Sequence, residues 1–116
     1  MSTEAYFVIE GNDVRYFRSR DDVEGSVEAY DIDEVRLFTV DGTQVGLARS
    51  GYGVVVTDRV IGRLPEDLGR ALRAHLLYVP RGRRSLDDGE IERASLADLV
   101  GETIRIEKPN RKPFWR

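Results

Sequence analysis

The sequence predicts an α+β fold, with an antiparallel sheet of about five to six strands and helices packed mainly on one face. Short β-rich runs alternate with Gly- and Asp-containing turn signals, and one long segment carries apolar residues at helical spacing. The chain has 116 residues, of which 41% are hydrophobic and 34% charged, which suffices for one core. We therefore expect a single domain over residues 1–107 and a basic, proline-containing C-terminal tail over residues 108–116.

The first two strands are predicted at Ala5–Glu10 and Val14–Arg18, which are rich in β-forming residues. Gly11-Asn12-Asp13 between them indicates a hairpin. Ser19, with Asp22 three positions later, has the spacing of a helix N-cap.

In the helix that follows, Val23, Val27 and Tyr30 fall at i, i+4 and i+7 and should share one buried stripe. At about 100° per residue, acidic side chains project on the opposite side. These are Asp21, Glu24 and Glu28.

The middle of the chain predicts two further hairpins. Asp41-Gly42-Thr43 lies between the apolar runs Val35–Val40 and Val45–Arg49, and Asp-Gly in this setting favours a tight turn. Gly51-Tyr52-Gly53 is a second turn. It leads into Val54-Val55-Val56, which is apolar enough to be a central strand.

A helix from Pro65 to about Val79 is predicted next, with proline in its first turn. Its apolar stripe consists of Leu64, Leu68, Leu72, Leu76 and Val79. Ser-x-x-Asp patterns at Ser85 and Ser95 predict the N-caps of one or two short helices. Thr103–Glu107 alternates apolar and polar residues, which predicts a last strand.

Composition excludes several classes of function. There is no cysteine, which excludes disulfides, thiolate catalysis and zinc–thiolate sites. No apolar run approaches the roughly 20 residues of a membrane span, and the N-terminus does not resemble a signal peptide, so we expect a cytoplasmic protein.

Sixteen of the 18 basic residues are Arg, as in GC-rich genomes such as those of actinobacteria. No metal, cofactor or enzymatic motif is recognised; calcium-loop and phosphate-loop patterns are incomplete.

Charge is distributed unevenly along the chain. Residues 1–41 carry a charge of −7 and the remainder +4, giving −3 in total. Seven acids lie within Asp21–Glu34, which contains no Lys or Arg. Asp21 and Asp22 are explained by the helix dipole, because both fall in the first turn. Solvation explains the later acids less well, since repulsion among them has a cost. The predicted partner-binding residues are Glu28, Tyr30, Asp31, Asp33 and Glu34.

Other residues have structural alternatives. His75, the only histidine, is a candidate base or ligand, but its place within the leucine stripe favours a core-edge histidine bonded to backbone. Arg81, Arg83 and Arg84 form a secondary basic patch that suits either nucleic-acid phosphates or a solvated helix end. Phe114-Trp115 is expected to dock on the core or on a partner.

Three segments together resemble small actinobacterial immunity-like proteins, the cognate inhibitors of polymorphic or contact-dependent toxins. These are Tyr16–Glu24, Val27–Ile32 and Val40-Asp41-Gly42, in which a strand leads into a short acidic helix and a hairpin. The resemblance covers roughly residues 6–45. It implies a non-enzymatic protein that occludes a basic surface of a secreted toxin domain with its acidic patch, Tyr30 serving as aromatic anchor. The alternatives are a nucleic-acid-associated protein that uses Arg81–Arg84 and the tail, or a structural subunit of a larger assembly. Membrane and nucleic-acid partners are not expected, and the oligomeric state stays open.

Overall fold

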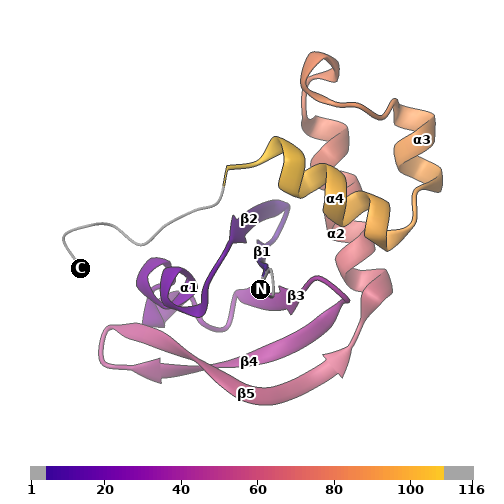
Figure 1. The fold of residues 1–116 in the computed structure, drawn as a ribbon. Coiled ribbons are helices and arrows are strands. Elements are labelled where there is room, and N and C mark those ends of the chain that lie inside the picture. Colours follow the sequence, from indigo (N-terminus) through magenta and orange to yellow (C-terminus); the bar gives the residue numbers. More distant parts are fainter. Residues whose placement is uncertain (1–4, 109–116) are drawn as a thin grey trace.

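The computed structural model describes residues 5–108 and confirms the α+β class. Its sheet has five antiparallel strands in the order β2-β1-β3-β4-β5, with β4 and β5 forming a long twisted ribbon (Figure 1). The strands are β1 Tyr6–Glu10, β2 Asp13–Phe17, β3 Val35–Thr39, β4 Thr43–Ser50 and β5 Gly53–Arg63.

Four α-helices accompany the sheet. The helices α2, α3 and α4 group together, whereas α1 lies apart from them beside the β4–β5 ribbon (Figure 1). The helices are α1 Arg20–Ser26, α2 Pro65–Tyr78, α3 Asp88–Arg93 and α4 Leu96–Ile106, with short 3₁₀ turns η1 Ala29–Asp31 and η2 Arg81–Arg83. Within the described residues, no helix has the length and apolarity needed to cross a membrane.

The strand β1 supplies both hydrophobic cores, because its side chains alternate between the two faces of the sheet. Phe7 and Ile9 belong to the core that the leucine stripe of α2 and Leu99 of α4 complete. Tyr6 and Val8 belong to a second core, which also contains Val23, Val27, Leu37, Val54 and Val56. The three helices α2–α4 thus cover one face, and α1 with the β4–β5 ribbon closes the other.

The prediction that Val54-Val55-Val56 forms a central strand is wrong, because β5 lies at an edge of the sheet. The outward N–H of Val56 donates to the Glu24 carboxylate at 2.7 Å. The helix α1 therefore covers this part of the edge, which permits an apolar run in a position that usually requires polar residues.

The predicted strand Thr103–Glu107 is also wrong, since residues up to Ile106 belong to α4. Ser95 caps this helix as expected, accepting a hydrogen bond from the Asp98 N–H at 3.2 Å. The hydroxyl of Thr103 donates to the carbonyl of Leu99, one turn earlier, at 2.8 Å. Ile104 and Ile106, which are two positions apart, therefore lie in the last turn of a helix that begins at Leu96.

Ser85, predicted as a second cap, does not start a helix. The N-cap of α3 is Asp87, which forms a reciprocal capping box with Glu90. The N–H and hydroxyl of Ser85 donate instead to Glu102 of α4, both at 2.7 Å.

The acidic helix is shorter than its periodicity indicates. Ser19 caps it as predicted, but α1 ends at Ser26 and the chain turns again in η1. Val23 and Val27 are buried, whereas Tyr30 leaves the predicted stripe and is 78% exposed. Glu28 lies between the end of α1 and the start of η1, so it does not share a helical face with Asp21 and Glu24.

Candidate protein-binding surface

Three carboxylates meet at the end of β1. One oxygen from each of Glu10, Asp31 and Glu34 lies within 4.8 Å of the others, and we call these residues the acidic cluster. Asp31 ends η1, and the backbone N–H of Glu34 donates to the Asp31 carbonyl at 2.9 Å, which turns both side chains toward one place. Like charges this close repel one another, so a cation or basic group beside them is favourable.

Glu10 is absent from the residues predicted as the binding site. It joins the acidic cluster because β1 pairs with β3 in a register that places Glu10 opposite Val35, the residue after Glu34. The one signal in the sequence was its position as the acidic end of an apolar strand. Only the register of β1 on β3 brings the Glu10 side chain close to those of Asp31 and Glu34.

Two exposed tyrosines lie on neighbouring turns at this end of the molecule. Tyr30 is in η1, and Tyr52, which is 94% exposed, is in the β4–β5 turn. The N–H of Ala29 donates to the carbonyl of Tyr52 at 3.0 Å, which holds the two turns together. Tyrosine is enriched among the residues that dominate protein–protein binding, because its ring is large, rigid and amphipathic. Tyr52 was predicted only as a turn residue.

Asp33 has a different environment from the acidic cluster. Its carboxylate is 3.3 Å from the guanidinium of Arg49 in β4, and both side chains are largely exposed. Exposed pairs of this kind contribute little to stability. Asp33 is therefore partly neutralised, whereas among residues 5–108 neither Asp31 nor Glu34 has an ion-pair partner.

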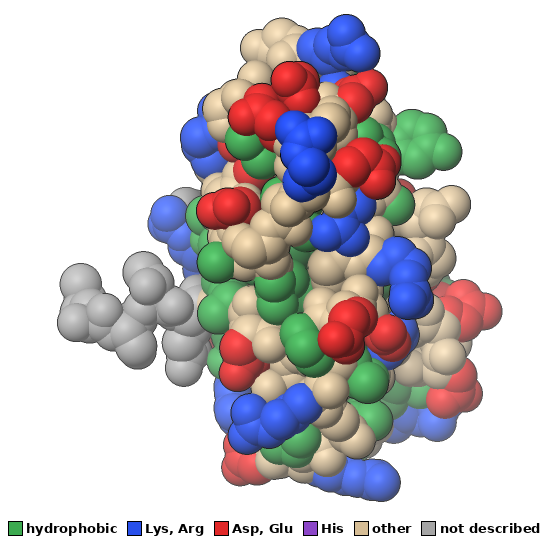
Figure 2. All heavy atoms as spheres, turned by 90° about the vertical axis from the view of Figure 1, so that its right-hand side faces the viewer, with side chains coloured by type: hydrophobic (Ala, Val, Ile, Leu, Met, Phe, Trp, Pro, Cys, Tyr) green, Lys and Arg blue, Asp and Glu red, His purple; other side chains and the backbone are tan. Residues whose placement is uncertain are grey.

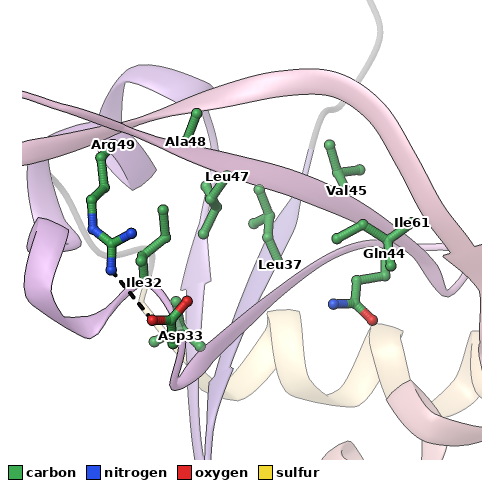
Figure 3. A pocket seen from close by; sticks show the side chains of 10 residues that line it. Ile32, Asp33, Leu37, Gln44, Val45, Leu47, Ala48, Arg49 and Ile61 are labelled. Atoms are coloured by element: carbon green, nitrogen blue, oxygen red, sulfur yellow. Dashed lines mark hydrogen bonds and ion pairs between the residues drawn. The ribbon is translucent and has the colours of Figure 1, made fainter.

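A groove of about 430 Å³ opens beside Asp33, between β3 and β4 (Figure 3). These strands pair only at Leu37 with Val45 and at Phe38 with Gln44, after which β4 diverges together with β5. The Asp33–Arg49 pair lies at one end of the groove and Gln44 with Ile61 at the other (Figure 3). The apolar side chains that line it are Ile32, Val35, Leu37, Val45, Leu47 and Ile61.

The acidic cluster is also the place in the described residues where a metal ion would find oxygen donors. Carboxylates suit hard cations such as Ca²⁺, but calcium takes roughly six to eight oxygen ligands. Three carboxylates that are half-buried or exposed fall short of that number.

The secondary basic patch is largely engaged within the molecule. Arg81 and Arg84 both contact the Asp88 carboxylate, at 3.1 and 2.9 Å, and these bonds, that of Arg84 foremost, lower the pKa of Asp88. The Arg84 side chain is only 3% exposed. Arg83 donates to the carbonyl of Ile106 at 3.4 Å. These arginines tie η2 to α3 and α4.

Figure 2 shows a face of the molecule on which acidic and basic side chains are interspersed around hydrophobic ones. No single sign of charge dominates this view. A groove that follows a nucleic-acid backbone needs positive charge in continuous array, and this face does not supply it.

We predicted a hydrogen bond from His75 to the backbone, but His75 contacts a carboxylate instead. Its Nε2 lies 3.0 Å from Oε1 of Glu107, and both side chains are mostly buried. The contact joins α2 to the residue that follows α4. Phe114 and Trp115, expected to dock on the core or a partner, lie outside the described residues.

Comparison of the chain with family models, curated proteins and solved structures finds no match. The function is therefore inferred from the chemistry of the residues.

Proposed function

We propose that this chain is a non-enzymatic protein-binding module whose acidic surface occludes a basic surface of its partner. The observation that carries the proposal is the acidic cluster of Glu10, Asp31 and Glu34 next to the exposed Tyr30. Uncompensated carboxylates raise the rate of association with a basic protein, and an adjacent tyrosine supplies contact area. Such a surface serves an inhibitor that binds one partner stoichiometrically.

The most concrete form of the proposal is a cytoplasmic immunity protein that neutralises a cognate toxin, as the resemblance of residues 6–45 implies. Toxins that act on nucleic acids present lysines and arginines to phosphate groups. Carboxylates at Asp31 and Glu34 would occupy those cations in place of the substrate. Tyr52 then extends the contact predicted for Tyr30.

The binding test is a double charge reversal, Asp31→Lys with Glu34→Lys. Asp33 is left unchanged because it already pairs with Arg49. With a partner isolated from the source cells and purified, we expect affinity to fall by about tenfold or more, mainly through slower association. The matched control reverses two exposed acids on the helices, Glu66→Lys with Glu92→Lys, and should bind like the unaltered chain. Equal affinity of both double variants, or a partner with an acidic contact surface, would contradict the proposal.

The immunity role has its own test in living cells. The chain is co-expressed with each toxic protein domain found among the neighbouring genes of its source genome, and growth of the host is followed. We expect the unaltered chain and the Glu66/Glu92 variant to restore growth and the Asp31/Glu34 variant to fail. If the unaltered chain gives no protection, the immunity role is wrong even when a basic partner binds.

A further inference from the structure

The groove between β3 and β4 is bordered by strand segments that pair on one side only. Val35 and Arg36 of β3 pair with β1, and no strand of residues 5–108 pairs with them on the side that faces β4. Residues 47–50 of β4 pair with β5, and no described strand pairs with them on the side that faces β3. An unpaired strand edge presents backbone N–H and C=O groups to which an added strand can bind. The groove is therefore open to an extended segment that continues the sheet.

The floor of the groove is apolar and has the length of a short strand. Leu37 and Leu47 lie near its middle and Ile61 towards one end (Figure 3). From Gln44 to Arg49, which lie at opposite ends, β4 advances by about 17 Å, at roughly 3.4 Å per residue. Side chains alternate between the two faces of an extended segment, so every second side chain of a segment of this length would rest on the floor.

One wall of the groove is acidic. Asp33 and Val35 line the groove, and Glu34 lies between them in sequence, so the acidic cluster borders this wall. Glu34 is exposed and Asp31 is half-buried. Among the described residues, Arg49 is the one basic side chain that lines the groove, and it pairs with Asp33. Basic residues of a bound segment are therefore attracted to this wall and acidic residues are repelled.

We propose that the groove binds an extended segment of the protein partner by strand addition, with apolar residues on the floor and basic residues beside the acidic cluster. The proposal rests on the proposed function, because it names the part of a basic partner that this surface accepts. A segment in which apolar and basic residues alternate satisfies the floor, the acidic wall and the strand edges together.

A synthetic peptide tests the groove without the partner. The probe is a capped eight-residue peptide of alternating valine and lysine, which is added to the purified, isotope-labelled chain and followed by NMR. We expect the backbone amides of residues 35–36 and 47–50 to shift, and those that face the groove to exchange more slowly with solvent. A peptide of alternating valine and glutamate should bind about tenfold more weakly or less, because the acidic cluster repels it.

N-methylation of the peptide tests the backbone pairing. Successive N–H groups of an extended segment point to opposite edges, so methylating every valine, or every lysine, removes the donors along one edge. At least one of these two peptides should bind about tenfold more weakly than the unmethylated peptide, because its hydrogen bonds to the sheet edge are lost.

Ile61→Lys places a cation in the groove and should weaken binding of the valine–lysine peptide by about tenfold or more. Val60→Lys is the matched control. Val60 and Ile61 are adjacent in β5 and similarly exposed, at 55% and 52%, but only Ile61 lines the groove. Val60→Lys should bind the peptide like the unaltered chain, and circular dichroism should show the same fold in both variants.

Three outcomes with the peptides overturn the proposal. Absence of binding at millimolar valine–lysine peptide, or amide shifts confined to other surfaces, means that the groove does not accept an extended segment. Equal binding of the methylated and unmethylated peptides means that the sheet edges do not pair. Shifts at residues 47–50 that change when the chain alone is diluted mean that a second copy occupies the groove.

The purified partner separates this proposal from the proposed function. A partner that loses affinity for the Asp31/Glu34 variant but not for Ile61→Lys would leave the proposed function standing and overturn the groove proposal. If the peptide binds in the groove while the partner binds the Asp31/Glu34 variant as tightly as the unaltered chain, only the proposed function fails.

Discussion

At the scale of single residues, Glu102 is the charged group most dependent on the fold. It is 5% exposed and accepts hydrogen bonds from Arg105, from the N–H and hydroxyl of Ser85, and from the Leu86 N–H. The bond from Arg105, assisted by Ser85 and Leu86 and opposed by burial, lowers the pKa of Glu102 from 4.5 to about 2. The ionised carboxylate thus anchors the loop before α3 to α4.

This arrangement makes stability depend on pH. A lowered pKa in the folded state contributes stability that is present above pH 4.5 and is lost as the pH falls toward 2. We expect Glu102→Gln to reduce the free energy of unfolding at pH 7 by on the order of 3 kcal/mol. The variant should also lose less stability than the unaltered chain between pH 5 and 2.

Urea unfolding at several pH values measures both effects. Asp41, Asp67 and Asp88 also have lowered pKa values, so the unaltered chain should destabilise in acid even after the Glu102 contribution is removed. Parallel pH profiles of the two proteins would contradict the role assigned to Glu102. Glu92→Gln, at an exposed position, is the control.

At the scale of elements, two glycines have opposite structural roles. Gly101 lies exposed in α4, and a Cβ there would meet no atom within 4 Å. Gly42, in the β3–β4 turn, has φ +86°, and a Cβ there would overlap the backbone of Pro65 at the start of α2. Only the second position requires glycine, because it combines a left-handed backbone with a close approach of two elements.

We expect Gly101→Ala to raise the free energy of unfolding by about 0.5–1 kcal/mol, since alanine is the better helix former. Gly42→Ala should lower it by more than 1 kcal/mol. Thermal unfolding followed by circular dichroism distinguishes the two. A loss of stability in Gly101→Ala would be inconsistent with a helix over Leu96–Ile106.

At the scale of the whole molecule, β1 couples two cores that lie on opposite faces of the sheet. Phe7 and Ile9 contact one core, and Tyr6 and Val8 the other. A change in either core should therefore destabilise both layers. This coupling also holds the acidic cluster, whose members come from the end of β1 and from the loop before β3.

Val54→Ala tests the coupling from the side remote from α2. We expect a loss of about 2 kcal/mol in unfolding free energy. The protection of the Leu72 amide in α2 against hydrogen exchange should decrease by the same free energy. Unchanged protection at Leu72 would mean that the two faces unfold independently.

Much of the local structure was predictable, and the reason is physical. Ser19 and Ser95 cap helices, and the stripe from Leu68 to Leu76 is buried, because caps and helical periodicity depend only on residues a few positions apart. The secondary structure of short segments was harder to predict. The alternation around Ile104 and Ile106 fitted a strand, and only the run from Ser95 shows that the segment continues a helix.

Composition and near neighbours along the chain were enough to predict an α+β fold with hairpin turns, capped helices and an acidic first third. Tertiary structure decided which of those acids matter together. The register of β1 on β3 brings Glu10 to Asp31 and Glu34, and Arg49 of β4 pairs with Asp33. It also made β5 an edge strand and opened the groove where β4 leaves β3. Each of these follows from pairing between segments distant in sequence, which periodicity along the chain does not encode.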